Sequence, residues 1–316
     1  MALRGGIDLG GTKIEAVVVD PDGAVVGQSR GPTPHEGGPP AVIKALASGL
    51  QDAAKAAGVE PAELSGVGVG SPGEVEEGSV AHARNLPDWD GSFPLASALS
   101  EQVGVPVSVA NDVGVAVDAE AKLGAGKDYA SFLGVWWGTG IGGAVVVGGK
   151  RWLGRGAAGE IGHTVVKLGG RRCECGRRGC LEAYAGRGAM ERRARREVAK
   201  GTKTDLFDLM EKHGRARLTS GIWARALHRD DKLAHKLIVG AVEALGAGIA
   251  STVNLLDLEA VVIGGGLGTR FGQPYIEKIK REMMKHLFVP ERPPAVLPAG
   301  LGDLGGAIGA SLLVGA

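Results

Sequence analysis

Cysteine, net charge and long apolar runs are all scarce in this sequence. Three of the 316 residues are cysteine, and the formal net charge at neutral pH is only +1. A chain without excess charge has no general attraction for nucleic acid or for an anionic membrane surface. We therefore expect neither of these as a partner.

No segment predicts a secretion signal or a membrane anchor. The first residues, MALRGGIDLGG, lack the run of about seven apolar residues that a signal sequence needs. The most apolar stretch, from Val239 to Leu267, is interrupted by Glu243, Asn254 and Asp257. We expect no run of the roughly eighteen apolar residues that cross a bilayer. The expected location is the cytoplasm, where thiols stay reduced.

A short fixed repeat is also missing, although glycine is abundant. The 55 glycines are spread through the chain without a period, which argues against a collagen-like or disordered repeat. Apolar residues make up 44% of the chain, enough for a sizeable core. The length suits about two globular domains.

Strands alternate with helices in the first half of the chain, a pattern typical of α/β folds. We expect strands at residues 3–8, 14–20 and 24–30, a helix at 40–57, a strand at 66–70, a helix at 93–103, a strand at 106–112 and a helix at 113–123. The segment SPGEVEEGS, residues 71–79, is expected to be a loop.

The opening pattern returns near residue 130. Residues 130–150, ASFLGVWWGTGIGGAVVVGGK, repeat the strand, glycine turn and strand of GIDLGGTKIEAVVVD at residues 6–20. Such internal similarity indicates a duplicated fold. Helices are expected over about 182–256, then a buried strand at 259–266 and a small-residue helix at the C-terminus. We expect a small α/β lobe of residues 1–112 and 301–316 and a large one of 113–300.

Three glycine motifs let the backbone approach an anion closely: DLGGTK at 8–13, GTGIGG at 138–143 and GGG at 264–266. The first two lack the spacing of a P-loop. GTGIGG is also followed by a strand, where a dinucleotide-binding fold requires a helix. Either of these first two motifs is equally consistent with an ordinary hairpin turn. Their occurrence in two similar hairpins favours two halves that grip one ligand.

Asp112, in VANDVG, ends a strand and begins a helix. Ligands of α/β proteins usually bind beyond the carboxyl ends of strands, so this position suits a functional carboxylate. The residue pattern alone favours a simpler interpretation, in which Asp112 caps the helix.

All three cysteines lie in one loop, RRCECGRRGCLEA, residues 171–183. Clustered thiols in a reducing compartment indicate metal binding more often than a disulfide. With His163, ten residues upstream of Cys173, they offer the four ligands of a tetrahedral zinc site. Three incidental small residues are the alternative.

Glutamates lie on either side of the cysteines in the sequence. Glu160 and Glu182 would be brought near one region if zinc tied the loop together, and there they could bond a polyhydroxylated ligand. Two solvated surface glutamates are the alternative. The basic helix MERRARREVAK, residues 190–200, is expected to be a solvated surface face.

In their order along the chain, DLGGTK, VAND, GTGIGGA, GEIGH and CECGRRGCLE resemble the ROK family of bacterial sugar kinases and repressors. The similarity extends from about Gly6 to the C-terminal GAIGAS, essentially the whole chain. It implies the actin-like, Hsp70-like ATPase (ribonuclease H-like) fold, an α/β fold of two lobes with a central cleft that closes on the sugar.

The resemblance implies a role for each motif. Asp112 matches the catalytic base that takes the proton of the sugar hydroxyl. The positions that match sugar-binding residues are Asn85, Asn111, Glu160, His163 and Glu182. Asp8 matches the acidic position near Mg²⁺, and the nucleotide positions are Gly10, Gly11, Thr12, Lys13, Gly138, Thr139, Gly140, Gly264, Gly265 and Gly266. The zinc ligands would be His163, Cys173, Cys175 and Cys180, and with four protein ligands the zinc is expected to be structural.

The implied activity is ATP-dependent phosphorylation of the 6-hydroxyl of a hexose, with glucose as the first expectation (a glucokinase activity). Kinases of mannose, fructose, N-acetylglucosamine or N-acetylmannosamine use the same residues. A sugar-sensing repressor is the non-enzymatic alternative, disfavoured because only seven residues precede Asp8, where repressors carry a DNA-binding segment. ATP, Mg²⁺ and structural Zn²⁺ are the implied cofactors, polyphosphate is an alternative donor, and a homo-oligomer (dimer or tetramer) is implied.

Overall fold

The computed structural model describes residues 2–83 and 86–315 and divides the chain into two compact units. Unit 1 consists of Met1–Gly124 and Gly300–Ala316, and unit 2 of Ala125–Ala299. The sequence placed a lobe boundary after residue 112. The units divide after Gly124 instead, because the helix that starts at residue 112 packs against the C-terminal helix of unit 1.

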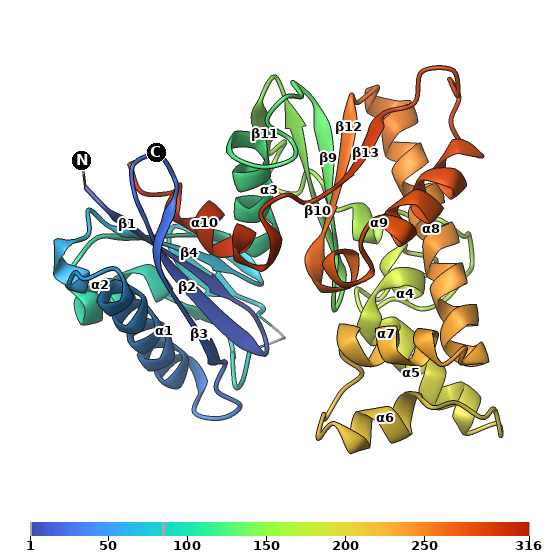
Figure 1. Ribbon diagram of the computed structural model, residues 1–316, viewed down its shortest axis with the longest axis horizontal. Coiled ribbons are helices and arrows are strands. Elements are labelled where there is room, and N and C mark those ends of the chain that lie inside the picture. Colours follow the sequence, from blue (N-terminus) through green and yellow to red (C-terminus); the bar gives the residue numbers. More distant parts are fainter. Residues whose placement is uncertain (1, 84–85, 316) are drawn as a thin grey trace. The chain divides into compact units, whose positions relative to one another are not determined.

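Unit 1 is built on a five-stranded mixed sheet with the order β3-β2-β1-β4-β8 (Figure 1). The first three strands pair antiparallel, and β1, β4 and β8 run parallel. The strands are β1 (Arg4–Leu9), β2 (Lys13–Val19), β3 (Val25–Pro32), β4 (Val67–Ser71) and β8 (Val107–Asn111), and the helices are α1 (Gly38–Ala56), α2 (Leu95–Val103), α3 (Asp112–Lys122) and α10 (Gly305–Ser311).

The alternation of side chains along β2 explains why helices cover both faces of this sheet. Ile14, Ala16 and Val18 join the core that contains α1 and α2. Val17 and Val19 point to the other face and join the core that contains α3 and α10. Since both faces are apolar, the second half of the strand, from Ala16 to Val19, is a continuous apolar run.

Small residues let α10 lie unusually close to the sheet. A Cβ on Gly6 of β1 would stand 2.0 Å from the Ala307 carbonyl oxygen, and one on Gly68 of β4 would stand 1.7 Å from that of Ala310. Any larger residue at these positions would force the helix away from the strands. The predicted small-residue helix therefore packs by close backbone approach, not by large side chains.

Unit 2 repeats the strand plan of unit 1. Its sheet has the order β11-β10-β9-β12-β13, with β11, β10 and β9 antiparallel and β9, β12 and β13 parallel. The strands are β9 (Phe132–Trp137), β10 (Ile141–Val147), β11 (Lys150–Trp152), β12 (Ala260–Gly264) and β13 (Ala295–Pro298). The repeated hairpin pattern in the sequence thus corresponds to a repeated sheet.

Along the chain, most helices of unit 2 follow β11 and precede β12. They are α4 (Glu182–Ala185), α5 (Arg187–Val198), α6 (Leu206–Lys212), α7 (Ser220–His228) and α8 (Lys232–Leu256), and α9 (Gly265–Met284) follows β12. α9 is kinked at Gly272, whose φ of 59° is left-handed, two residues before Pro274. A glycine and a proline at a kink are its ordinary cause.

By length and composition α8 could cross a membrane, which corrects the expectation that no segment is apolar enough. However, 61% of its most apolar window is buried inside unit 2. Its buried residues, among them Leu237, Ala241 and Leu245, recur at helical spacing and pack against α9 and α4. This burial is typical of a core helix.

Several parts of the chain differ from the sequence expectation. Residues 71–79 were expected to be a loop, but they include β5 (Glu74–Glu76) and β6 (Ser79–Ala81). These pair with β7 (Ser92–Phe93) in a separate three-stranded sheet. β13 was also missed, because AVLP is a short strand with a proline at its end.

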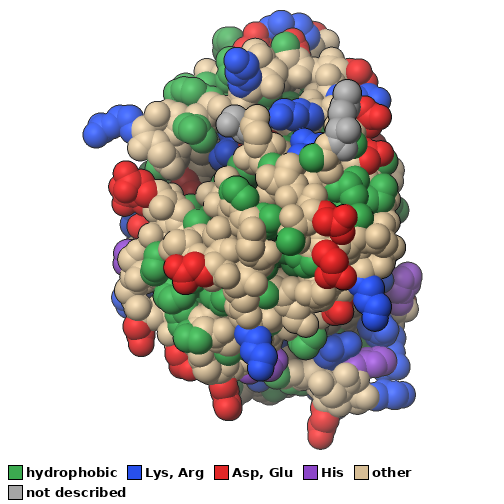
Figure 2. All heavy atoms as spheres, turned by 90° about the vertical axis from the view of Figure 1, so that its left-hand side faces the viewer, with side chains coloured by type: hydrophobic (Ala, Val, Ile, Leu, Met, Phe, Trp, Pro, Cys, Tyr) green, Lys and Arg blue, Asp and Glu red, His purple; other side chains and the backbone are tan. Residues whose placement is uncertain are grey.

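The face of the molecule drawn in Figure 2 carries charged side chains of both signs. Lysines and arginines are interspersed with aspartates and glutamates on this face, and neither sign forms a continuous patch. This distribution agrees with the small net charge of the chain.

Candidate functional site

In unit 1, the carboxyl ends of three parallel strands share one edge of the sheet. Asp8 of β1 is in register with Gly70 of β4, and Ser71 of β4 is in register with Asn111 of β8. Asp112 follows Asn111 directly and begins α3. The structure therefore brings Asp8 and Asp112 to one edge, the edge at which α/β proteins usually bind ligands.

Asp8 lies half-buried against α10. A Cβ on Gly306 would stand 2.8 Å from the carboxyl carbon of Asp8, so only glycine leaves room for this carboxylate. Burial is the main reason that the pKa of Asp8 is raised, to about 7. The carboxylates of Asp112 and Glu15 raise this pKa as well, and Lys13 opposes them. A divalent cation would favour the ionised form, and carboxylate oxygens are the ligands that Mg²⁺ prefers.

The turn between β1 and β2 contains Gly10, Gly11 and Thr12. The Gly10 amide donates to the Lys13 carbonyl at 2.9 Å and closes the hairpin. Thr33, which is 1% exposed, donates its hydroxyl to the Gly10 carbonyl at 2.5 Å. Thr33 therefore anchors the turn. Thr33 was not predicted from the sequence, because a single threonine after a strand has no spacing that marks it.

Lys13 was expected among the nucleotide positions, and in the structure its amine pairs with the carboxylate of Glu15. The Glu15 side chain is only 2% exposed, and it also lies 3.5 Å from the Nε of Arg30. A buried carboxylate needs such partners, because an uncompensated charge in the interior costs several kcal/mol. Lys13 thus has a local structural partner beside the turn.

Asn111, not Asp112, caps α3. The Asn111 Oδ1 accepts the Gly114 amide at 3.0 Å, whereas the Asp112 Oδ1 accepts the amide of the adjacent Val113 at 2.8 Å. The interpretation of Asp112 as the helix cap is therefore wrong, because the residue before it already fills that position. Asp112 itself is half-buried at the strand–helix junction.

In unit 2, two of the glycine motifs lie at the carboxyl ends of adjacent parallel strands. Gly264 of β12 is in register with Trp136 of β9, one residue before that strand ends. Gly265 has a φ of 80°, and a Cβ there would stand 2.8 Å from the Trp137 backbone nitrogen. The triple glycine therefore lies directly beside the start of the 138–140 turn, and only glycine fits at residue 265.

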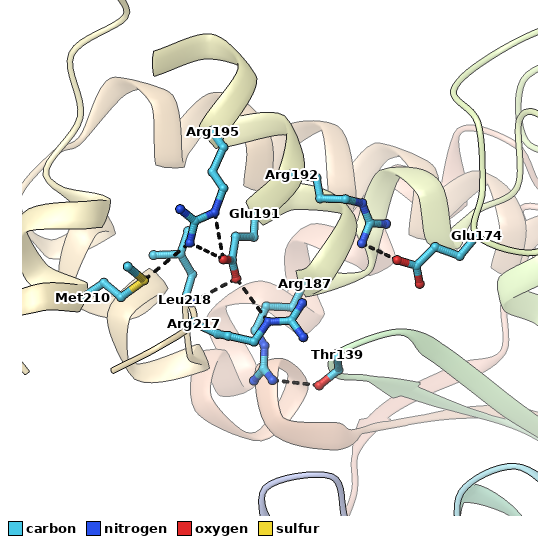
Figure 3. Close-up of polar contacts among 9 residues, drawn as sticks. All are labelled: Thr139, Glu174, Arg187, Glu191, Arg192, Arg195, Met210, Arg217 and Leu218. Carbon is cyan, nitrogen blue, oxygen red and sulfur yellow. Dashed lines mark hydrogen bonds and ion pairs between the residues drawn. The ribbon is translucent and has the colours of Figure 1, made fainter. Parts of the chain in front are cut away.

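The turn of residues 138–140 is held by the start of α5. The Arg187 amide donates to the Gly138 carbonyl at 3.1 Å, and the Gly188 amide donates to the Thr139 carbonyl at 3.0 Å. Figure 3 shows the Arg187 guanidinium against Thr139, whose Oγ1 accepts from Nη2 at 2.7 Å. Arg187 was not predicted from the sequence, since it belongs to a segment with many arginines and no distinctive spacing.

The four expected metal ligands come together. The Sγ atoms of Cys173, Cys175 and Cys180 and a ring nitrogen of His163 all lie within 4.8 Å of one another. The Cys175–Cys180 sulfur distance is 3.6 Å, and Cys173 Sγ lies 3.8 Å from His163 Nδ1. A tetrahedral zinc with Zn–S bonds of ~2.3 Å places its ligand atoms about 3.8 Å apart. The donor set and its spacing therefore fit Zn²⁺.

Two glycines allow the cysteine loop to fold back on itself. Gly176 and Gly179 have φ values of 88° and 87°, the left-handed region that favours glycine. The Cys173 amide donates to the Arg177 carbonyl at 2.8 Å, and Val165 and Cys180 form an isolated β-bridge. These contacts bring the cysteines of the loop beside the segment that contains His163.

Glu182 lies between the cluster of His163 and the three cysteines and the 138–140 turn. One carboxylate oxygen accepts the Ile141 amide at 2.9 Å, and the other lies 3.9 Å from Cys173 Sγ. A Cβ on Gly140 would stand 2.3 Å from the Glu182 Oε2. The carboxylate is therefore partly engaged in holding the start of β10, a contact that the sequence did not predict.

Glu160 and Asn85 are the two remaining predicted sugar-binding residues. Glu160 is exposed and precedes the short 3₁₀ turn Ile161–His163. Its carbonyl accepts the His163 amide at 3.0 Å. Asn85 lies outside the described residues.

These features agree with the comparison to known proteins. A family model described as the ROK family matches residues 4–316. The chain belongs to the ROK family. Among curated relatives, the glucokinase of Halalkalibacterium halodurans is 34% identical, over 87% of this chain and 83% of the relative. This membership confirms the resemblance found in the sequence motifs.

Solved structures of the ROK family support the same conclusion. A ROK family glucokinase from Streptomyces griseus, solved in complex with glucose and AMPPNP, is 32% identical with a TM-score of 0.82 over 98% of both chains. A ROK hexokinase from Thermus thermophilus is 35% identical with a TM-score of 0.77, over 98% of this chain and 97% of the other. The predicted actin-like ATPase fold is thereby confirmed.

Proposed function

We propose that this protein is an ATP-dependent hexose kinase that phosphorylates the 6-hydroxyl of glucose, a glucokinase. The observation that carries this proposal is the edge of unit 1, where Asp112 and the raised-pKa Asp8 end parallel strands beside a glycine turn. Its support from relatives is a 34% identical glucokinase and a 32% identical glucokinase solved with glucose and AMPPNP.

Asp112 is the proposed catalytic base. A sugar hydroxyl is a poor nucleophile, and a positioned carboxylate that accepts its proton contributes about 10²–10⁴-fold to the rate. Asp112 is half-buried, its backbone is held by the start of α3, and its neighbour Asn111 supplies the helix cap. The carboxylate therefore lies on a rigid element.

The glycine turns are the proposed phosphate-binding groups. Phosphoryl transfer depends mostly on positioning and charge stabilisation, and Mg²⁺ supplies neutralisation of the phosphate charge when it is bound. Asp8 would hold the metal ion. The phosphates would lie on backbone amides of Gly10, Gly11 and Thr12, with Lys13 beside them, and of Gly138, Thr139 and Gly140. Gly264, Gly265 and Gly266 would face the adenosine.

The zinc loop is proposed to shape the sugar site. Four protein ligands would complete a tetrahedron around Zn²⁺ and leave no position for a substrate, so the ion would be structural. His163 would hold the ion through Nδ1, the ring nitrogen that lies 3.8 Å from Cys173 Sγ, and this would leave Nε2 for the sugar. Glu160, Glu182, Asn111 and Asn85 are the other proposed sugar contacts.

The setting of the enzyme is part of the proposal. A cluster of three thiols requires a reducing compartment, which supports a cytoplasmic location. A homo-oligomer remains a prediction from the family resemblance.

A second candidate function is sugar sensing without catalysis. A putative xylose repressor from Caldicellulosiruptor is 29% identical over 90% of this chain and 70% of the repressor. The carboxylate pair and both glycine turns favour the kinase, because a sensor has no need of a base or of phosphate-binding turns.

A coupled assay of ADP formation tests the proposal. Glucose, mannose, fructose, N-acetylglucosamine and N-acetylmannosamine would each be offered with ATP and with polyphosphate. We expect turnover with ATP, fastest with glucose. Specific binding to DNA combined with no phosphorylation of any of these sugars would overturn the proposal.

A further inference from the structure

The basic helix α5 is more than a solvated surface face. Its first residue, Arg187, holds the 138–140 turn through Thr139, and the Glu191 side chain is only 7% exposed. Figure 3 shows that arginines from α5 and from the segment before α7 gather around Glu191 and Thr139. The arginines that contact Glu191 or Thr139 are Arg187, Arg195 and Arg217, whereas Arg192 pairs with Glu174.

The carboxylate of Glu191 does not balance this positive charge. It accepts the Leu218 amide at 3.0 Å and the Arg195 guanidinium at 2.7 Å. Arg217 approaches it less closely, with Nε at 3.8 Å, and the Arg217 side chain is 62% exposed. Most of the hydrogen-bonding capacity of the Arg217 guanidinium is therefore available to a further anion.

Arg187 and Arg217 act on one another as like charges. Burial lowers the pKa of Arg187, the charge of Arg217 lowers it further, and Glu191 opposes both effects. Two guanidinium groups that converge in this way are stabilised by an anion that both can bind. The electrostatics therefore agree with the geometry in indicating an anionic ligand.

The backbone of Gly188, in the first turn of α5, lies beside these guanidinium groups with no side chain of its own. A Cβ there would lie 3.5 Å from Arg192 Nη1, 3.6 Å from the Thr139 carbonyl oxygen and 3.8 Å from Arg217 Nη2. These are ordinary contact distances, so an added atom would fit among the guanidinium groups without a clash. The missing side chain of Gly188 keeps this space open.

We propose that Arg187 and Arg217 recognise the phosphate chain of the phosphoryl donor at the 138–140 turn. Arg217 would bind phosphate oxygens directly through its planar fork, and Arg187 would position the turn through Thr139. The inference rests on the proposed function, in which this turn binds the donor. The shared chemistry is a chain of phosphates, whether from a nucleoside triphosphate or from inorganic polyphosphate.

Calorimetry with magnesium complexes of ATP and tripolyphosphate, and with adenosine, tests the pair. We expect Arg217→Ala to weaken ATP binding about tenfold or more, the loss typical of a charged hydrogen bond, and to leave adenosine binding unchanged. If the wild type binds tripolyphosphate and Arg217→Ala weakens that binding as much as it weakens ATP binding, inorganic polyphosphate is a second source of the phosphate chain. Binding of ATP alone identifies the nucleotide as the source.

The control is Arg292→Ala, because Arg292 is exposed and pairs with Asp257 far along the chain from the cluster. Unchanged ATP affinity in Arg217→Ala, or an equal loss for adenosine, would overturn the inference. Wild-type protein that phosphorylates no sugar would contradict the proposed function. The comparison of ATP binding with adenosine binding would still test whether Arg187 and Arg217 recognise phosphate.

Two further variants separate recognition from folding. Gly188→Glu places a carboxylate among the arginines in the first turn of a helix, where acidic residues stabilise. We expect the melting temperature to be kept or raised while ATP affinity falls. Arg187→Lys keeps the charge but loses the planar guanidinium that donates to Thr139 Oγ1. This variant should have a higher KM for ATP and an unchanged KM for sugar. A rise in both KM values, or Gly188→Glu with normal ATP affinity, would count against the proposal.

Discussion

The two units share one strand plan and differ in what is inserted between the strands. In unit 1 the chain passes from β3 to β4 through α1, whereas in unit 2 it passes from β11 to β12 through the cysteine loop and α4 to α8. In both units a glycine turn joins the first two strands of the sheet. The shared sheet therefore determines where the turns lie, and the inserted segment gives unit 2 its cluster of one histidine and three cysteines.

The edges of the two sheets also differ in charge. The edge of unit 1 carries the carboxylates of Asp8 and Asp112, which suit a metal ion and a proton. The corresponding turn in unit 2 is bordered by Arg187 and Arg217, which suit phosphate. A duplicated framework thus supports two complementary electrostatic environments.

The largest expected effect is at the carboxyl edge of unit 1. Asp112→Asn removes the proposed base but keeps the size of the side chain, so kcat should fall by about 10²–10⁴-fold. Sugar affinity should change little. Steady-state kinetics and sugar titration measure the two quantities, and Asp22→Asn, at an exposed turn of the same unit, is the matched control. A variant with wild-type kcat would remove Asp112 from the mechanism.

The second-largest expected effect is at the cluster of His163 and the three cysteines in unit 2. Cys175→Ser or His163→Gln should reduce bound zinc from about one ion per chain to nearly none, since a structural site needs all four ligands. Sugar affinity should weaken and unit 2 should unfold at lower temperature. Metal analysis and calorimetry provide the measurements, with the exposed His228→Gln as control. Full zinc content in the cysteine variant, or unchanged affinity without zinc, would refute the assignment.

Asp8 makes the stability of unit 1 depend on pH. Its pKa is raised to about 7, so between about pH 4 and pH 7 the folded state keeps a proton that the unfolded chain has released. The free energy of unfolding therefore falls as pH rises through this window. Asp8→Asn should remove this loss and gain up to about 4 kcal/mol over the wild type at pH 8, with little gain at pH 4.

Urea unfolding at a series of pH values measures this difference. Asp52→Asn, on the exposed face of α1, should show no comparable gain. Magnesium with nucleotide should flatten the pH dependence of the wild type, because a cation favours the ionised carboxylate. Parallel pH profiles of wild type and Asp8→Asn would show that the carboxyl group of Asp8 is not perturbed by burial.

The smallest effect concerns the helix caps of the two units. Asn111→Ala should destabilise unit 1 by about 1 kcal/mol, and Thr219→Ala, which removes the cap of α7, should cost unit 2 a similar amount. Asn111→Asp keeps an acceptor and should restore most of the loss. Thermal unfolding measures all three, and equal stability of Asn111→Ala and wild type would contradict the capping role.

Much of the local structure was predictable because it depends on short-range pattern. The apolar run AVVV in β2, the period of α8 and the glycine-rich hairpins correspond to elements of the structure. The cluster of His163 with the three cysteines was also predictable, since three thiols within eight residues limit the chemistry available to them. β5 and β6 were not, because a short hairpin of mixed polar residues has the composition of a loop.

By itself, the sequence determined the strand–helix alternation, the duplicated hairpins, the family and the candidate metal ligands, because each of these depends on residue types at short spacing. Only the tertiary structure decided that Asn111 caps α3, that Asp8 lies confined by Gly306, and that Arg187 reaches Thr139 from 48 residues away. Such contacts join segments that are distant in the chain, and their energies depend on burial and geometry, which only the packed fold supplies.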